Sequence, residues 1–219
     1  MHAGSTSCPQ AIQKRWLGRV SYGRGLEAQE EAVRPRRAGE IDDTVFLLEH
    51  EPVYTIGRTR DRSSLRGEES LPHPVFETNR GGQAPYHGPG QLVGYPILDL
   101  TSYGRDLHTY LRALETALIA ACGEVGVAAA TRDGLTGVWC DGRKIASIGV
   151  GVRHWISMHG FAINVGDDLS GFDNIVPCGI GGVQMSSVSR EARQAVDLKD
   201  FGDLVFARLA NSLANLRGI

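Results

Sequence analysis

The chain has 219 residues, of which 42% are hydrophobic and 22% charged, with a formal net charge of −2 at pH 7. This is the composition of a globular protein that buries a real core, and we expect one domain over residues 1–219. The near-neutral charge disfavours strong attraction to nucleic acid or anionic lipid, so we expect neither nucleic acid nor a membrane as a partner.

The four cysteines, at positions 8, 122, 140 and 178, form no C-x-x-C pair and show no zinc-type spacing. We therefore expect no disulfide framework and no metal site, and a reducing compartment. Residues 1–16 lack the apolar core of a secretory signal, and no stretch approaches the roughly 18 apolar residues of a membrane span. We expect a cytoplasmic protein, with an organelle transit peptide at residues 1–16 as an open alternative.

In chain order, the first predicted elements are a short strand at 17–21 and a helix at 26–33, which Pro35 and Gly39 are expected to close. Two β-rich apolar runs, 44–48 and 53–56, predict core strands. The polar stretch 58–74 predicts a mobile surface excursion. Residues 75–78 predict another strand, which leads to Arg80.

Residues 80–91 hold four glycines and two prolines, a content incompatible with a regular helix. Proline removes backbone donors, and glycine opens conformations closed to other residues, so we expect a shaped loop whose peptide groups approach a ligand. The loop carries Arg80 and His87 and runs into an apolar stretch at 92–98 that predicts a buried strand. The predicted ligand loop is therefore anchored on a core strand.

In the second half of the chain, Asp106 predicts the N-cap of a helix whose leucines, at spacings of four, three and four from Leu107 to Leu118, form one apolar face. The Asp-Gly pair at 141–142 predicts a tight hairpin. With the alternating residues that follow, it indicates a three-stranded meander over about 135–165. Apolar residues between 201 and 216 predict a closing helix.

Candidate chemistry lies in three places: the glycine loop with His87, the meander with Lys144 and His159, and segment 174–182 with Cys178. Cys178 stands between a proline and a glycine, where peptide N–H groups can face the sulfur or an attached acyl oxygen, as is typical of a nucleophile. A thiol becomes reactive at neutral pH beside a base or cation, which Lys144 or a histidine could supply. Taken singly, each residue more often has a structural role.

The other cysteines in predicted regular elements, Cys122 and Cys140, are interpreted as core residues. Arginines at 58, 60, 62 and 66 could meet an acidic carrier protein, although a solvated surface run is the commoner role of such residues.

Several blocks in the same order resemble the lipoyl(octanoyl) transferases, which belong to the biotin/lipoate protein ligase superfamily. They cover residues 49–57, 80–82, 86–91, 142–150, 159–165 and 175–180. One departure is visible, because the family commonly has threonine where this chain has Pro85.

The resemblance implies a single α/β domain with a mixed β-sheet and flanking helices, like that of biotin and lipoate protein ligases. It implies that Cys178 takes an octanoyl group from octanoyl-acyl carrier protein as a thioester and passes it to a lysine of a lipoyl domain. The acceptors would be the lipoyl domains of 2-oxoacid dehydrogenases and the glycine cleavage H protein, with no cofactor. Lys144 matches the family position credited with lowering the thiol pKa.

The resemblance also implies an acyl pocket between the glycine loop and the meander. Its substrate-binding segments match Arg80, Gly81, Gly82, Gln83, Ala84, Pro85, Tyr86, His87, Ser147, Ile148, Gly149, Gly160, Phe161 and Ala162. His159 and Asn164 are supporting candidates. His87 and His159 could orient the donor, stabilise an oxyanion or hold two loops together.

Three other functions remain open. An ATP-dependent lipoate or biotin ligase of the same fold would turn residues 80–82 toward a phosphate or carboxylate, but Cys178 argues against it. An idle module that binds acyl groups or lipoyl domains is disfavoured by the presence of both Cys178 and Lys144. A cysteine hydrolase would need a Cys/His/Asn ordering that is not recognisable here.

Overall fold

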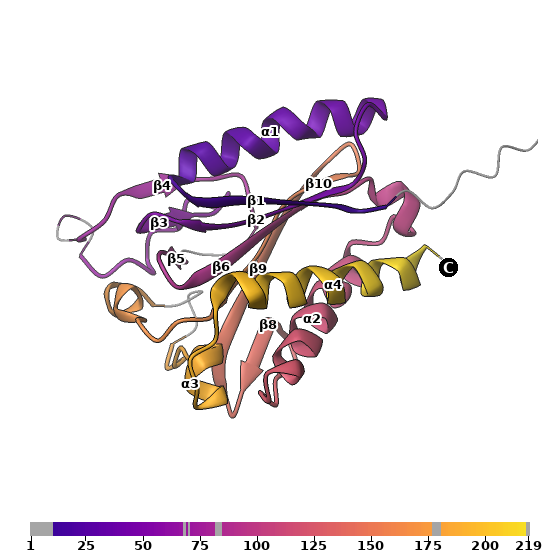
Figure 1. Ribbon diagram of the computed structural model, residues 1–219. Helices are drawn as coiled ribbons and strands as arrows, with labels where there is room; N and C mark the ends of the chain where they lie inside the picture. The colour runs from indigo at the N-terminus through magenta and orange to yellow at the C-terminus, as the bar shows by residue number, and fades with distance from the viewer. Residues whose placement is uncertain (1–10, 68, 70, 82–84, 177–180, 218–219) are drawn as a thin grey trace, which may run out of the picture.

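A seven-stranded mixed sheet forms the centre of the computed structural model, which describes residues 11–67, 69, 71–81, 85–176 and 181–217 (Figure 1). Across the sheet, the strands are β1 Gln13–Val20, β2 Thr44–His50, β6 Gln91–Ile97, β10 Ile156–Asn164, β9 Arg143–Arg153, β8 Leu135–Cys140 and β7 Ala130–Arg132. β1 and β2 pair in parallel, and the other neighbours pair antiparallel. The β8–β9–β10 meander confirms the hairpin prediction at 141–142.

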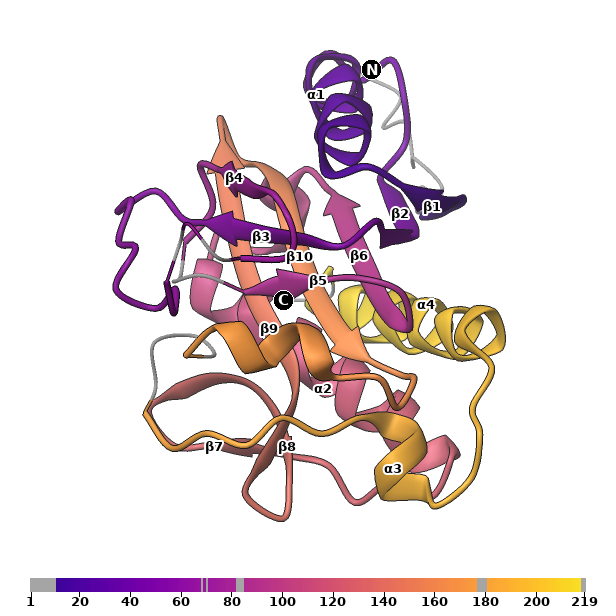
Figure 2. The same ribbon diagram turned by 90° about the vertical axis from the view of Figure 1, so that its left-hand side faces the viewer.

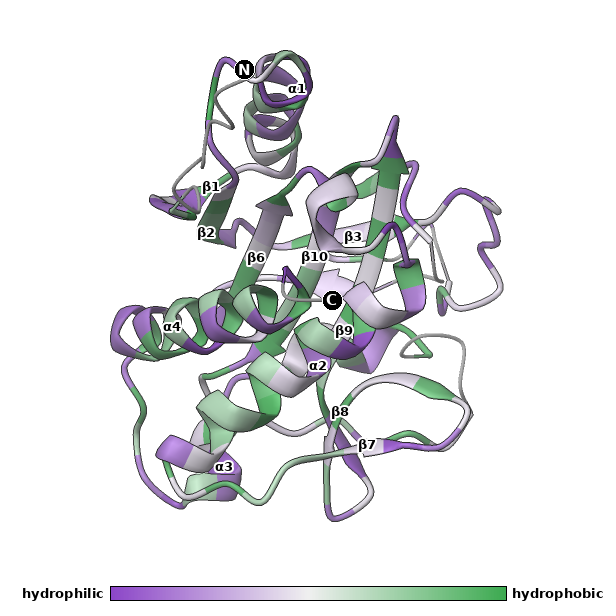
Figure 3. Cartoon of the chain, turned by 90° about the vertical axis from the view of Figure 1, so that its right-hand side faces the viewer, coloured by the Kyte–Doolittle hydropathy of each residue, from purple (hydrophilic) through white to green (hydrophobic). Residues whose placement is uncertain are grey.

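Helices cover both faces of this sheet. α1 (Tyr22–Ala38) lies on one face, and α2 (Leu107–Glu124) and α4 (Leu198–Leu216) pack together on the other (Figures 1 and 3). The main apolar core lies under α2 and α4, and a second one lies under α1. The predicted α/β architecture with a mixed sheet and flanking helices is therefore confirmed. Within the described ranges, no helix combines the length and apolar character needed to cross a membrane.

A smaller sheet lies in front of β9 and β10 in the view of Figure 2. Its strands, in spatial order, are β4 Val75–Glu77, β3 Val53–Ile56 and β5 Tyr86–His87. The run 53–56 is thus a buried strand, as predicted, but it belongs to a separate sheet. The glycine loop contains a short strand, β5, which pairs with β3 and fixes the direction of His87. Its many glycines and prolines concealed this strand.

The first helix is longer than predicted, and Pro35 lies inside it rather than ending it. Gly39, with φ of +74°, caps the C-terminus by donating its N–H to Arg36 O, as a residue in the left-handed region does. The side chain of Arg36 is buried and donates from Nε to Asp43 at 2.6 Å, so the last turn is held beyond the proline.

Other predictions hold in part. Asp106 caps α2 by accepting from His108 N at 2.8 Å, and Leu114 and Leu118 are fully buried, but Leu107 is 40% exposed. The 58–74 segment is not wholly a surface excursion, because Ser64 is buried. Three short helices in the described part of the chain were not expected from the sequence: η2 Leu100–Tyr103, η3 Ser170–Asn174 and α3 Val188–Ala192.

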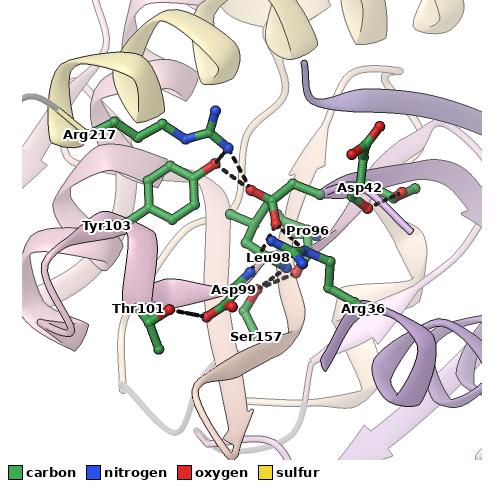
Figure 4. A network of polar contacts seen from close by, with 11 residues as sticks. Arg36, Asp42, Pro96, Leu98, Asp99, Thr101, Tyr103, Ser157 and Arg217 are labelled. Carbon is green, nitrogen blue, oxygen red and sulfur yellow. Dashed lines mark hydrogen bonds and ion pairs between the residues drawn. The ribbon is translucent and has the colours of Figure 1, made fainter. Parts of the chain in front are cut away.

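A buried carboxylate ties distant elements together (Figure 4). Asp43 is fully buried and accepts hydrogen bonds from Arg36 Nε, Tyr103 Oη and Arg217 at 2.6, 2.6 and 2.8 Å. It also accepts from the Asp99 N–H at 2.9 Å. The network fixes η2, and with it the start of α2, to the sheet.

Candidate active site

A cavity of about 630 Å³ opens between the small sheet, the strands β6, β9 and β10, and the start of α2. Its volume is typical of a small-molecule site. The predicted site residues that line it are Arg80, Gly81, Pro85, His87, Lys144, Ser147, Ile148, Gly149, His159, Gly160, Phe161 and Ala162. The structure thus brings the glycine loop and the meander together around one space.

Two of the predicted residues that the structure describes, Tyr86 and Asn164, do not line the cavity. Tyr86 is buried behind it, with its ring 5.5 Å from those of Tyr54 and Phe172. Asn164 lies behind it in a hydrogen-bond relay. The other four predicted residues, Gly82, Gln83, Ala84 and Cys178, lie outside the described residues.

The cavity also has lining residues that the sequence did not indicate. Tyr22 enters from the first turn of α1, Tyr95 from β6, and Leu107 and Leu111 from the start of α2. For Leu107 and Leu111, the sequence indicated only that they belong to the apolar face of the predicted helix. The two tyrosines stand in ordinary helix and strand patterns.

Arg80 holds the glycine loop against the small sheet. Its guanidinium donates to Thr55 Oγ1 at 2.8 Å and to the carbonyl of Gly81 at 2.9 Å. On β9, a Cβ on Gly149 would stand 3.0 Å from the Gly81 carbonyl oxygen, closer than side chains normally approach. Gly149 therefore permits the contact between loop and strand. The Pro85 carbonyl accepts from Thr55 N at 3.1 Å, so the loop is held there by its main chain.

Lys144 is 2% exposed, although lysine is rarely buried. Its ammonium lies 5.2 Å from the centre of the Trp139 ring and donates to Thr136 O at 3.3 Å. The pairing of β8 with β9 shifts register at this point, beside Gly137. A Cβ on Gly137 would stand 2.9 Å from Lys144 Cε, so the bulge makes room for the lysine side chain.

The described residues on either side of segment 177–180 are fixed by main-chain hydrogen bonds. Before it, Val176 N donates to Ser64 O at 2.7 Å. After it, Lys144 N donates to Gln184 O at 2.8 Å, and Ser186 N donates to Lys144 O at 2.9 Å. Residues 184–186 are therefore paired with Lys144 itself, on strand β9.

A relay of side chains sets the protonation of His87. Gln91 Nε2 donates to Asn164 Oδ1 at 2.9 Å and to Tyr86 O at 3.2 Å, which leaves Gln91 Oε1 as an acceptor. His87 Nδ1 lies 2.7 Å from this oxygen and must therefore carry the proton. Nε2 of His87 then carries a lone pair.

His50 is fixed in the same tautomer beside it. Its Nδ1 lies 3.1 Å from Val20 O, which only accepts, so Nδ1 is protonated. The hydroxyl of Tyr95 then donates to His50 Nε2 across 2.7 Å. The oxygen of Tyr95 keeps its own acceptor capacity at the cavity wall.

His159 has an unusual conformation. Its φ is +56° in the middle of β10, and its N–H donates to the buried Gln29 side chain of α1 at 2.7 Å. The ring is 4% exposed, and among the described residues its Nδ1 has no hydrogen-bond partner. The next residue, Gly160, has no room for a side chain, because a Cβ there would stand 2.3 Å from Gly94 O. Strain of this kind at a cavity wall is common in functional sites.

All three imidazoles are neutral at pH 7. Burial lowers the pKa of His50 to about 4 and that of His159 to about 4. Burial and the neighbouring His50 lower the pKa of His87 to about 3. The polar wall of the cavity therefore offers neutral hydrogen-bonding groups.

One group of possible metal ligands lies outside the cavity, where Cys140, Asp141 and Glu191 have ligand atoms within 4.8 Å of one another. Arg143 donates to both carboxylate oxygens of Glu191, each at 2.8 Å. The guanidinium of Arg143 thus binds the carboxylate oxygens that a metal would need as ligands, and we assign no metal to this group.

The family model and the similar proteins of known name indicate the same family for this chain. Residues 21–210 match the lipoyl protein ligase A/B catalytic domain family. An octanoyltransferase of Geobacter sulfurreducens is 48% identical over 194 residues, which cover 89% of this chain and 81% of the relative. One of Rubrobacter xylanophilus is 50% identical over 191 residues, with 84% of this chain and 86% of the relative covered.

Solved structures share the fold at low identity. Lipoate-protein ligase A bound with ATP superimposes with a TM-score of 0.76 at 15% identity, covering 93% of this chain and 86% of the ligase. The biotin protein ligase of Aquifex aeolicus gives a TM-score of 0.57 at 14% identity, with 94% and 70% covered.

Proposed function

The chain belongs to the lipoyl protein ligase A/B catalytic domain family and has lipoyl(octanoyl) transferase activity, and we propose that it works through a thioester on Cys178. Its relatives support transfer of an octanoyl group to lipoyl domains. In our proposal the donor is octanoyl-acyl carrier protein. The acceptors are lysines on the lipoyl domains of 2-oxoacid dehydrogenases and of the glycine cleavage H protein.

The buried Lys144 at the cavity wall carries this proposal. Burying an ammonium costs free energy, so a buried lysine at a cavity wall is a candidate functional group, and here Met185, seven residues after Cys178, pairs with Lys144. A cation near a cysteine favours the reactive thiolate. The main-chain hydrogen bonds of Gln184 and Ser186 with Lys144 support the proposal, because they join the lysine to residues a few positions after Cys178 in the chain.

The reaction then consists of two balanced acyl transfers. In loading, the Cys178 thiolate attacks the donor carbonyl, a new C–S bond forms and the C–S bond of the donor breaks. The carrier leaves as a thiolate that takes the proton of the Lys144 ammonium, which leaves Lys144 neutral. In discharge, the neutral amine of the acceptor lysine attacks, a C–N bond forms, and the bond to Cys178 breaks. The proton of the amine passes to Lys144 in its neutral form. Because a thioester is already activated, neither step needs ATP or a metal.

The apolar part of the cavity supports an acyl substrate. Val93, Ile148, Phe161 and Ala162 line it and exclude water from the hydrocarbon. The neutral imidazoles of His87 and His159, with Tyr95, occupy the polar part of the wall. This division of the lining fits a substrate with a hydrocarbon chain and one polar reacting group.

Intact-mass measurement after mixing the protein with octanoyl-acyl carrier protein, without nucleotide, tests the proposal. We expect a mass gain of one octanoyl group, lost in Cys178→Ser and kept in Cys140→Ser, because Cys140 is a buried core thiol. Addition of a lipoyl domain should remove the group from the enzyme. Product that forms only with ATP would indicate a ligase, and an adduct retained by Cys178→Ser would refute the thioester.

Lys144→Ala separates the two roles of the lysine. We expect slower loading and slower discharge in single-turnover assays, because the ammonium favours the thiolate and the amine accepts the proton. Unchanged discharge would remove the second role.

A further inference from the structure

The large apolar side chains that stay exposed on the described part of the chain gather around the mouth of the cavity. Leu107 and Val152 are each 40% exposed and line it. Phe76 is 38% exposed, with its ring 5.0 Å from that of Tyr22, another lining residue. Trp155 is 39% exposed and follows Val152 by three residues. Exposed apolar side chains that cluster at one place mark an interaction site more often than scattered ones do.

Trp155 has an exposed ring and a strained backbone conformation. It lies in the turn between β9 and β10, where φ is +52° at His154 and +65° at Trp155. Neither is glycine, and the left-handed region is unfavourable for a residue that has a side chain. A bulky aromatic residue held in this way, yet largely outside the core, suggests a function on the surface.

The turn is tied to the start of α2. Leu100 N donates to Trp155 O at 2.8 Å, and Arg105 N donates to Leu100 O at 3.1 Å. The β9–β10 turn and the residues before Leu107 therefore form one edge of the cavity mouth.

Exposed cations accompany these apolar residues. Arg58 lines the cavity, Arg105 lies next to the start of α2, and Arg153 follows Val152. Of the nearby carboxylates, Asp106 is engaged in capping α2. Glu77 is engaged by Arg60 and Arg62. The mouth therefore suits a protein surface that combines apolar contact with acidic side chains.

Reach decides which protein must rest on this mouth. Lys144 is 2% exposed, so the chemistry lies inside the cavity. A lysine side chain extends only about 6 Å from its Cα, given ordinary bond lengths. A folded domain that offers its own lysine must therefore sit directly on the mouth. A carrier protein delivers its acyl group on a longer prosthetic arm and can stand further away.

We propose that Leu107, Val152 and Trp155, with the flanking arginines at 58, 105 and 153, form the docking surface for the acceptor lipoyl domain. This inference rests on the proposed function. The lipoyl domain places the turn that carries its lysine over the mouth, with acidic side chains beside the arginines. Trp155 supplies the rigid apolar contact, as aromatic residues do in interfaces.

Trp155→Gly and Arg153→Glu test this surface in the full-length protein. Glycine suits the left-handed conformation, so Trp155→Gly removes the ring and relieves strain, and the fold should not suffer. We expect the KM for the lipoyl domain in the discharge step to rise about tenfold in each variant, the effect of losing one strong contact. The rate of loading from octanoyl-acyl carrier protein, and discharge to hydroxylamine, should stay unchanged.

His154→Gly is the matched control, because it relieves the same strain one residue earlier and leaves the Trp155 ring. Replacing an acidic residue beside the acceptor lysine by Lys should restore part of the affinity for Arg153→Glu. An unchanged KM for the lipoyl domain in both variants, or an equal rise in the KM for the carrier protein, would overturn the inference. Failure of the wild-type protein to be acylated would instead refute the proposed function.

Discussion

Nδ1 of His87 lies 2.7 Å from Oε1 of Gln91, and this one contact fixes what the histidine can do in the cavity. The amide nitrogen of Gln91 donates to Asn164 and Tyr86, so the atom that faces His87 is the amide oxygen, which only accepts. His87 is thus a neutral imidazole with its lone pair on Nε2. A lone pair accepts a hydrogen bond from a substrate N–H or O–H and cannot stabilise an oxyanion, so the relay favours an orienting role.

The tautomer of His87 can be observed directly. We expect long-range ¹H–¹⁵N spectra to show Nδ1 protonated and Nε2 unprotonated at pH 7, unchanged down to about pH 5, because the pKa is lowered to about 3. Gln91→Met should give a mixture of tautomers and slow the transfer about tenfold through lost orientation. A proton found on Nε2 of the wild-type ring would contradict the assignment.

Gly137 should prove as important for activity as residues of the predicted site. A Cβ there would stand 2.5 Å from Ala146 O and 2.9 Å from Lys144 Cε, at φ of +131°. We expect Gly137→Ala to displace the lysine and lower the single-turnover rates by about 100-fold, since a shift of about 1 Å at a reacting group has an effect of that size.

Gly134→Ala provides the control for backbone strain. Its φ is +73°, and nothing lies within 4 Å of the added Cβ. This variant should lose about 1 kcal/mol of stability and keep its transfer rate. Equal rate losses in the two variants would show that the contact of Gly137 with Lys144 is irrelevant.

The sequence could predict the elements whose signals are local. The alternating residues around the Asp-Gly pair give the β8–β9–β10 meander, and the side chain of Asp106 caps α2 as expected. It could not predict the second sheet, because strand β5 is only two residues long and depends on pairing with β3. The prediction for the end of α1 was wrong. The buried ion pair of Arg36 and Asp43 outweighs the helix-breaking effect of Pro35.

Some residues of the site could likewise be predicted from the sequence, and others could not. Arg80, His87 and Lys144 stand in motifs with unusual composition, and all three line the cavity. Tyr22 and Tyr95 reach it from an ordinary helix and strand, and only tertiary packing brings them there. The role of Cys178 stays a prediction.

The three buried histidines should make the protein sensitive to mild acid. In the unfolded chain their ordinary pKa is 6.5, whereas in the folded protein it is about 4 for His50 and His159 and about 3 for His87. Below pH 6.5 the unfolded chain therefore binds more protons, and stability falls as the pH falls toward 4. Each histidine contributes at most about 1.4 kcal/mol per pH unit.

Urea unfolding between pH 7.5 and 4.5 measures this slope. His159→Gln should reduce it by the share of one proton, and His154→Gln, at an exposed position, should not change it. A free energy of unfolding that stays constant from pH 7 to pH 5 would contradict neutral, buried imidazoles.

The carboxylate of Asp43 should be among the most important single groups for stability. It accepts from Arg36 and Arg217, and the fully buried carboxylate is the shared partner of both cations. Asp43→Asn leaves the guanidinium of Arg36 buried without its counter-charge, which typically costs about 3–5 kcal/mol. In a chain of this size, we expect the Tm to fall by about 10 °C or more.

Asp42→Asn is the neighbouring control. The hydrogen bond from Thr44 goes to the main-chain oxygen of Asp42, so a change of side chain leaves it intact, and we expect the Tm to stay within about 2 °C of wild type. Calorimetry of the two variants at pH 7 separates the network from a general effect of lost negative charge. Equal shifts in both would show that Asp43 acts only through net charge, because the two substitutions remove the same charge from adjacent positions.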